Sequence, residues 1–290
     1  MVADQGPPSH AVFADPELAR RIDGAEANLS TQVAAAARRR DPAAPFFVQS
    51  LAGGIAVCLG PQSPLTKVIG VGFAGIPDGA ELEAVELAFL ERGAPVRAEV
   101  ATLADPAFSA TLSKRGYVLE GFENVLGRAI IPDDAAETAI PGIEVTQTTD
   151  ARVWTDVVID GFQQPDTGVV SAPGEFFPRE ALEQAYADTA AAGGFSRYLA
   201  RIGGVAVGGA TMRIDGAVAQ LCGAATLLPF RRRGVQTALL RARLRDAAHA
   251  GCDIAVVTTQ PGSRSQQNVQ RRGFALLYSR AILVKALPVA

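Results

Sequence analysis

Helical and strand periodicities alternate along the second half of the chain. Apolar residues of segment 150–162 fall on one helical face after Thr149, and a second helix-forming segment covers 179–191. Three segments rich in apolar and β-branched residues follow, joined by Gly-Gly at 203–204 and Asp-Gly at 215–216, which are typical of hairpin turns. The predicted strands are 143–147, 196–202, 205–214, 217–226 and 254–259, and the last long helix is 235–250. This order predicts a mixed, mostly antiparallel sheet flanked by helices.

The first half repeats this outline in a plainer form. Both halves end alike, because segments 112–130 and 269–287 each carry a helix-like stretch into an Arg-Gly-aromatic triplet and then apolar strand residues. The stretch 132–141 between the halves is acidic and bracketed by prolines. We therefore predict two tandem domains of α/β class, over 1–135 and 142–290. The elements predicted in the first are helices over 16–39 and 81–92 and strands over 46–51, 54–59, 68–73 and 96–103.

The composition is that of a soluble globular protein. Hydrophobic residues make up 48% of the chain and charged residues 20%, so a sizeable core can form. No apolar run reaches the roughly 18 residues of a membrane span, and the amino terminus lacks the pattern of a signal peptide, which favours a cytoplasmic protein. The three cysteines are far apart and only two histidines occur. We therefore expect neither a disulfide framework nor a metal site.

Positive charge is concentrated in one part of the chain. The formal net charge of −3 argues against broad nucleic-acid binding. The segment 231–280 nevertheless holds ten arginines and two acidic residues, so it carries +8 and leaves −11 for the remainder. This one region is suited to binding an anion.

The unit that carries the chemistry is a strand, a turn and a helix. Strand 217–226 leads through Pro229 into the arginine triplet 231–233, then Gly234 and helix 235–250. A glycine lets the backbone approach a ligand closely, and the free N–H groups at a helix start attract an anion. Arginine heads add charge-assisted hydrogen bonds. Because the pattern Gly-x-x-x-x-Gly-Lys-Ser/Thr is absent, this phosphate cradle differs from that of an ordinary nucleoside triphosphatase.

Two motifs in this half resemble those of the GNAT superfamily of acyl-CoA-dependent N-acetyltransferases. The first family signature is Arg/Gln-x-x-Gly-x-Gly/Ala after the fourth strand, which Arg231 and Gly234 match, whereas Gln236 stands at the last position. The second is a strand, a short helix and Gly-Phe, present here at 273–274. The resemblance covers about 143–287 with both motifs in order, and the first half more loosely.

The resemblance implies binding of acetyl-CoA or another short acyl-CoA, with no metal, and direct transfer of the acyl group to an amine. The pantetheine arm would lie where the fourth strand diverges from the fifth, and the pyrophosphate would lie at 231–237. The reaction needs a base for the ammonium, a backbone N–H that polarises the carbonyl, and an acid for the thiolate. The implied cofactor-binding residues are Ala225, Leu227, Arg231, Arg232, Arg233, Gly234, Val235, Gln236, Thr237, Asn268 and Arg271.

The groups that would move protons depart from the family pattern. Many members carry a tyrosine four residues before the glycine of Gly-Phe as the acid, and Val269 takes that place here. Tyr278 is the nearest alternative. The fourth strand of this half contains no carboxylate, whereas the irregular loop 163–178 is a candidate substrate-side flap. The open candidates for the base are a water chain, Asp166, Glu175 and Glu180.

The corresponding turn of the first half has no cradle. Segment 74–81 contains two acids and no arginine, which would repel a pyrophosphate, so we interpret this half as a degenerate copy. The expected function is an N-acyltransferase acting on a small-molecule or peptide amine. A non-catalytic acyl-CoA sensor or scaffold is the alternative. Association as a homodimer stays open, and neither nucleic acid nor a membrane is expected as a partner.

Overall fold

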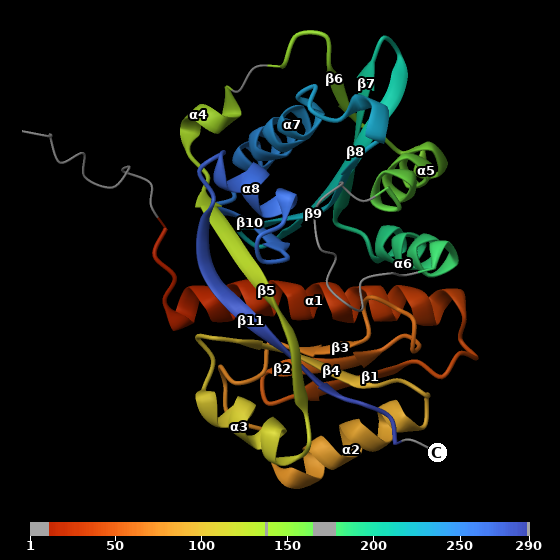
Figure 1. The fold of residues 1–290 in the computed structure, drawn as a ribbon, viewed down its shortest axis with the longest axis vertical. Helices are drawn as coiled ribbons and strands as arrows, with labels where there is room; N and C mark the ends of the chain where they lie inside the picture. The colour runs from red at the N-terminus through yellow and green to blue at the C-terminus, as the bar shows by residue number, and fades with distance from the viewer. Residues whose placement is uncertain (1–11, 137–138, 165–177, 289–290) are drawn as a thin grey trace, which may run out of the picture. The chain divides into compact units, whose positions relative to one another are not determined.

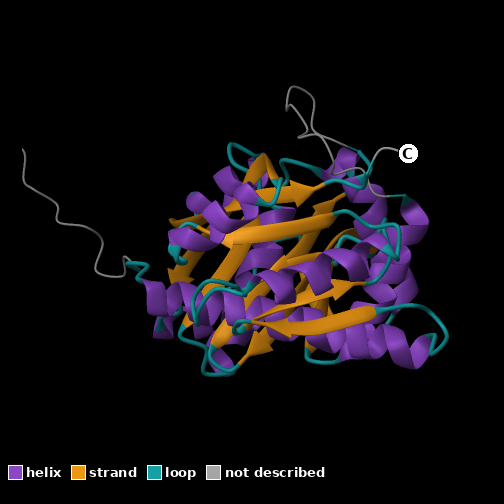
Figure 2. Cartoon of the chain, turned by 90° about the horizontal axis from the view of Figure 1, so that it is seen from below, coloured by secondary structure: helices purple, strands orange, loops and turns teal. Residues whose placement is uncertain are grey.

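The computed structural model of the protein describes residues 12–136, 139–164 and 178–288. Their helices and strands form two compact units (Figure 1). Unit 1 contains the described parts of Asn124–Thr167 and Ser196–Leu277. Unit 2 contains the described parts of Asp15–Glu123, Gly168–Phe195 and Tyr278–Ala290. Helices pack against strands in both units, as expected for the α/β class (Figure 2).

Unit 1 is built on a mixed sheet with the strand order β5-β10-β9-β8-β7-β6. The pairs β5–β10, β8–β9 and β6–β7 are antiparallel, and β9–β10 is parallel. The elements are β6 (Glu144–Gln147), α5 (Ala151–Phe162), β7 (Phe195–Ile202), β8 (Val205–Asp215), β9 (Val218–Thr226), a 3-10 turn (Leu228–Phe230), α7 (Val235–His249), β10 (Ile254–Thr259) and α8 (Arg264–Gln270), with the short α4 (Pro132–Ala135).

Two neighbouring glycines of β8 allow helices to pack closely on both faces of this sheet. A Cβ added at Gly208 would lie 2.7 Å from a methyl of Val235 on α7, and one at Gly209 would lie 2.7 Å from a methyl of Val158 on α5. Successive side chains of a strand point to opposite faces. Helices α7 and α5 therefore cover opposite faces of β8, each at a position where only glycine fits.

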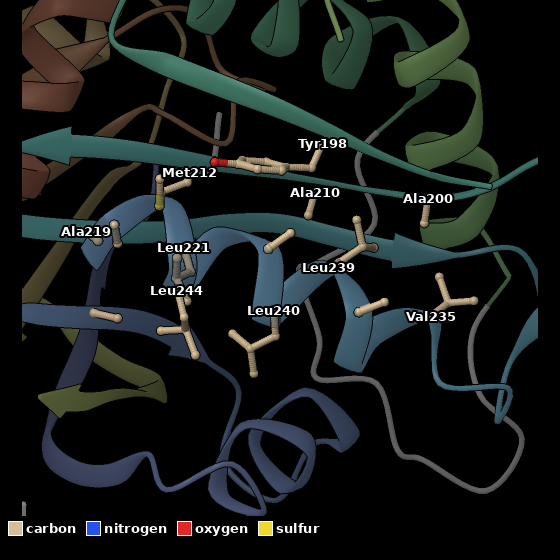
Figure 3. Packing of buried hydrophobic residues seen from close by; sticks show 14 of the residues in the cluster. Tyr198, Ala200, Ala210, Met212, Ala219, Leu221, Val235, Leu239, Leu240 and Leu244 are labelled. Carbon is tan, nitrogen blue, oxygen red and sulfur yellow. The ribbon is translucent and has the colours of Figure 1, made fainter. Parts of the chain in front are cut away.

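The core of unit 1 lies between α7 and the strands. Leu239 and Leu244 of α7 are buried against Ala219 and Leu221 of β9, with Met212 of β8 in the same cluster (Figure 3). Fully burying a leucine side chain contributes about 1.5–3 kcal/mol. This apolar contact fixes the direction of α7, and with it the position of its N-terminus.

Unit 2 has the strand order β1-β2-β3-β4-β11, with β3 and β4 parallel and the other neighbours antiparallel. Its strand β3 is shorter than the predicted 68–73, because Gly70 and Gly72 adopt left-handed backbone angles (φ 76° and 97°) that a strand cannot continue through. The elements are α1 (Pro16–Arg40), β1 (Phe47–Leu51), β2 (Gly54–Cys58), β3 (Lys67–Ile69), α2 (Gly79–Leu90), β4 (Val96–Ala101), α3 (Pro106–Lys114) and α6 (Arg179–Ala192).

Each unit takes one strand from the other half of the sequence. Strand β5 (Val118–Ala129) pairs with β10 through residues 124–129, and β11 (Ala275–Lys285) pairs with β4 through residues 280–285. Helix α6 likewise comes from the second half of the sequence, directly after α5, but it belongs to unit 2. The two tandem domains over 1–135 and 142–290 therefore stay a prediction, which is based on the similar endings of the two halves of the sequence.

Candidate anion-binding site

Strands β9 and β10 separate at one end of the unit 1 sheet. Their parallel pairing joins Val218–Gln220 to Ile254–Val256, although both strands run on for at least three more residues. Beyond Gln220, β9 pairs with β8 through an irregular register that includes a bulge, whereas β10 continues along β5. The chain therefore opens between the carboxyl ends of two parallel strands, where open α/β sheets commonly bind ligands.

The segment after β9 leads to the N-terminus of α7, which begins after a glycine N-cap. Arg232 and Gly234 both have left-handed backbone angles, φ 63° and 88°, and Gly234 is the N-cap residue of the helix. Gly234 has no side chain that could cap the helix, and no side-chain cap is found among the described residues. The N–H groups of the first helical turn have no intrahelical partner, and the helix dipole places partial positive charge there. This turn presents the donors that a phosphate group requires.

Side chains around this turn form a second layer of contacts. Gln236 Nε2 donates to Thr226 Oγ1 at 2.9 Å, which joins the first turn of α7 to the end of β9. Arg272 donates through Nη2 to Thr237 Oγ1 at 3.0 Å. Arg233 lies over the ring of Phe230, with its guanidinium carbon 5.5 Å from the ring centre. Arg272 was not among the predicted site residues, although the Arg-Arg doublet before Gly-Phe was a signal for it.

The structure brings most of the predicted cofactor-binding residues together around the opening. Ala225 is buried near the end of β9, and the segment 231–237 forms the turn and first residues of α7. Leu227 uses its N–H for Val207 O, at 2.9 Å, and its carbonyl accepts from Phe230 N at 2.9 Å. A ligand could therefore use only the remaining lone pair of that carbonyl. Asn268 in α8 and Arg271 at its C-cap are exposed.

The predicted proton-transfer groups are distributed differently. Val269 stands where many members of the GNAT superfamily carry the tyrosine that acts as the acid. Its apolar side chain packs against the core of unit 1. Tyr278 belongs to unit 2, where its hydroxyl donates to Asp23 Oδ1 at 2.6 Å. Burial and the Asp23 carboxylate raise the pKa of this tyrosine far above its usual value. Its proton is thus directed to Asp23. Glu180 is exposed in α6, while Asp166 and Glu175 lie outside the described residues.

The equivalent helix start in unit 2 is closed to an anion. Asp78 caps α2 by accepting from Ala80 N at 2.9 Å and Glu81 N at 2.8 Å, and Glu81 accepts from Asp78 N in return. This capping box occupies two of the first-turn donors, Ala80 N and Glu81 N, and adds two carboxylates. In addition, Gly72 O accepts from Asp105 N at 2.9 Å, so the segment after β3 is bonded to the β4–α3 connection.

Other site types find no support in the part of the chain that is described. There, no group of three or more histidine, cysteine, aspartate or glutamate residues could hold a metal ion. Nor is any helix within the described ranges both long and apolar enough to cross a membrane. The cysteines Cys58, Cys222 and Cys252 are not joined in disulfides, and Cys58 and Cys252 are buried.

Part of the chain matches a known protein family in sequence, and the chain is similar to solved structures. Residues 164–274 match the model of the acetyltransferase (GNAT) family, a stretch that contains β9, the arginine turn, α7 and α8. No curated protein matches the chain. A GCN5-related N-acetyltransferase from Kribbella flavida has a similar structure, with a TM-score of 0.63 at 17% identity, covering 93% of this chain and 96% of its own.

A tandem GNAT protein from the clavulanic acid biosynthesis pathway is similar over nearly its whole length. The TM-score is 0.60 at 13% identity, with 96% of this chain and 98% of that chain covered. A GCN5-related N-acetyltransferase from Sphaerobacter thermophilus gives a TM-score of 0.53 at 14% identity over 71% of this chain and 66% of its own. Residues 164–274 thus match the acetyltransferase (GNAT) family model, and the fold of the described chain is similar to that of a tandem GNAT protein.

Proposed function

We propose that the protein is an acyl-CoA-dependent N-acyltransferase, with acetyl-CoA as the expected donor and an amine as acceptor. The observation that carries this proposal is the uncapped N-terminus of α7 beside the opening between β9 and β10, inside the stretch that matches the family model. The pyrophosphate would accept hydrogen bonds from the N–H groups of the first turn. The pantetheine arm would enter between the two strands.

The contrast between the two units supports one cofactor site per chain. Helix α7 starts at a glycine without a capping side chain, whereas α2 starts with a capping box made of two acids. A phosphate at α2 would have to displace both carboxylates and would be repelled by them. We assign cofactor binding to unit 1 and none to unit 2.

In the proposed reaction the amine nitrogen attacks the thioester carbonyl carbon, the C–S bond breaks, and its electron pair leaves on sulfur. One ammonium proton must be removed before the attack, a second leaves the nitrogen as the amide forms, and the thiolate takes up one proton, so one proton is released to solvent overall. Because Val269 is apolar and the hydroxyl of Tyr278 is bonded to Asp23, water is the proton carrier that we propose. The residues of unit 1 would then act by binding and orienting the donor.

The same Val269 observation favours a second candidate, a non-catalytic acyl-CoA sensor. Turnover separates the two. The purified chain, incubated with acetyl-CoA and a panel of polyamines, aminoglycosides, amino acids and peptides, is expected to release free thiol with at least one amine above the no-amine rate. Binding of acetyl-CoA without release of thiol for any amine in the panel would favour the sensor. Absence of binding would contradict both candidates.

Arg272 is expected to contribute directly to cofactor affinity. Its guanidinium is held at the first turn of α7 by Thr237, whereas Arg271 beside it makes no such contact with a described residue. A charge-assisted hydrogen bond contributes about 1.5–3 kcal/mol. Arg272→Ala should therefore raise the Kd for acetyl-CoA by roughly 10- to 100-fold in isothermal titration calorimetry. The control variant Arg201→Ala removes a similar bond, from Arg201 Nη1 of β7 to Thr146 Oγ1 of β6 at 3.3 Å, and should change the Kd by less than about threefold. An equal effect of the two variants would contradict this assignment.

The remaining expectations of the sequence stay predictions. These are a cytoplasmic location, an amine acceptor of small-molecule or peptide type, homodimer formation as an open alternative, and no nucleic-acid or membrane partner.

A further inference from the structure

Within the described ranges, the guanidinium of Arg231 donates to three backbone carbonyls. Its Nε donates to Thr226 O at 3.2 Å, and its Nη2 donates to Gly161 O at 2.9 Å and to Gln164 O. Thr226 is the last residue of β9, and Gly161 lies in the last turn of α5. One side chain thus joins the end of a strand, the end of a helix and the turn before α7.

One of these acceptors, Gly161 O in the last turn of α5, is a carbonyl that a helix end leaves open. The last carbonyls of an α-helix have no intrahelical donor and carry partial negative charge. An arginine at that position satisfies them and is attracted by the dipole, so the arrangement needs no bound anion to explain it. In the GNAT signature this is the arginine that precedes Gly234 by three residues, and the sequence suggests that it binds phosphate.

The three pieces that Arg231 joins are also packed directly together. A Cβ added to Gly161 would lie 2.8 Å from Ala225 Cβ and 3.2 Å from Thr226 N, so the end of α5 rests on the end of β9. On the other side, Gln236 donates to the hydroxyl of Thr226. The backbone of the arginine turn therefore starts and ends at points fixed by Thr226.

We propose that Arg231 is a positioning residue, whose guanidinium holds the ends of β9 and α5 so that the turn 232–237 presents its N–H groups to the pyrophosphate. The charge that meets the pyrophosphate then comes from the helix N-terminus and from other arginines, with Arg272 as the one already fixed in place. This inference rests on the proposed function and reassigns one residue within it.

Three variants distinguish positioning from charge. Arg231→Gln keeps N–H donors for the carbonyls but has no charge, Arg231→Lys keeps the charge without the planar fork, and Arg231→Ala keeps neither. Titration calorimetry with acetyl-CoA at low and high salt gives the Kd and its salt dependence. We expect Gln to stay within about threefold of the unaltered protein, and Lys and Ala to weaken binding about tenfold or more. The salt dependence should be unchanged in all three.

The opposite ranking overturns the inference. If Arg231 contacts the pyrophosphate, Lys binds more tightly than Gln, and the salt dependence falls in the Gln and Ala variants. Unchanged affinity in all three variants also overturns it. Thermal unfolding without ligand identifies a variant that fails to fold. In that case the mildest variant, Arg231→Gln, decides between positioning and direct contact through the salt dependence of its Kd for acetyl-CoA. If the unaltered protein itself does not bind acetyl-CoA, the proposed function fails rather than this assignment.

Discussion

Replacing Gly234 by valine is expected to abolish measurable acetyl-CoA binding. Gly234 has φ 88° and ψ 0°, in the left-handed region that a β-branched residue rarely adopts. A clash at Cβ is not the obstacle, because the nearest described atoms to a Cβ there are methyls of Ile143 and Ile140 at 3.6–4.0 Å, which is ordinary van der Waals contact. The valine would instead force a different backbone at the start of α7 and redirect the first-turn N–H groups. Losing one or two charge-assisted hydrogen bonds raises the Kd about 100-fold or more.

The other end of the same helix provides the control. Gly251 follows α7, has φ 76°, and has nothing within 4 Å of an added Cβ. Gly251→Val should lower the melting temperature by a similar amount, because it imposes the same backbone strain, yet leave the Kd for acetyl-CoA within about twofold. Equal loss of binding in both variants would show that the effect of the Gly234 change is general destabilisation.

Replacing Arg280 by methionine is expected to cause the largest loss of stability in unit 2. The Arg280 side chain is 2% exposed and donates to Asp23 Oδ1 through Nη2 at 2.7 Å and Nε at 3.1 Å. Its Nη1 also lies 3.6 Å from Glu99. The methionine would leave the Asp23 carboxylate buried without a cation. Breaking a buried pair in this way costs about 3–5 kcal/mol, measured as a lower urea midpoint for unit 2.

Two further variants test the cause of that loss. Adding Asp23→Asn to Arg280→Met removes the uncompensated charge and should recover part of the stability, because the amide can still accept from Tyr278. Arg97→Met breaks an exposed pair with Glu120, whose side chains are 38% and 48% exposed, and should cost less than about 1 kcal/mol. A comparable loss in Arg97→Met would contradict the role of burial.

Local motifs were sufficient to predict the fold class and the position of the helix start that we propose as the site. Gly234 after an arginine triplet, followed by an amphipathic helix, predicts a helix N-terminus open to an anion, and α7 begins there. The acids at 78 and 81 predict the opposite for the first half, and they form the capping box of α2. In both cases the backbone conformation follows from residues within one helical turn.

Pairing between the two halves could not be predicted in this way. The strands after each Arg-Gly-aromatic triplet are similar in pattern, so nothing local indicates that the end of β5 pairs with β10 and the end of β11 with β4. These partners are far apart in sequence. Their choice depends on the packing of whole units, which periodicity does not report.

The charge count likewise overstated the cations available to an anion. Arg243 is buried on α7, where it donates to Leu239 O and Thr211 O, and burial lowers its pKa to about 10. Arg280 pairs with Asp23, and Arg231 binds carbonyls. A sequence shows that an arginine is present but not which group its guanidinium contacts. We assign Arg272 to the candidate site, by contrast, because it donates to Thr237 at the first turn of α7.

Titration calorimetry of the whole chain with acetyl-CoA tests the central claim most directly. We predict saturable binding with one acetyl-CoA per chain, because α7 starts without a capping side chain beside the separated strands, whereas α2 is capped by Asp78 and Glu81. The same titration with the Gly234→Val variant should show no saturation over the same range of acetyl-CoA concentration. Two equivalents bound per chain, or one equivalent that survives in the Gly234→Val variant, would contradict the assignment of the site to the start of α7.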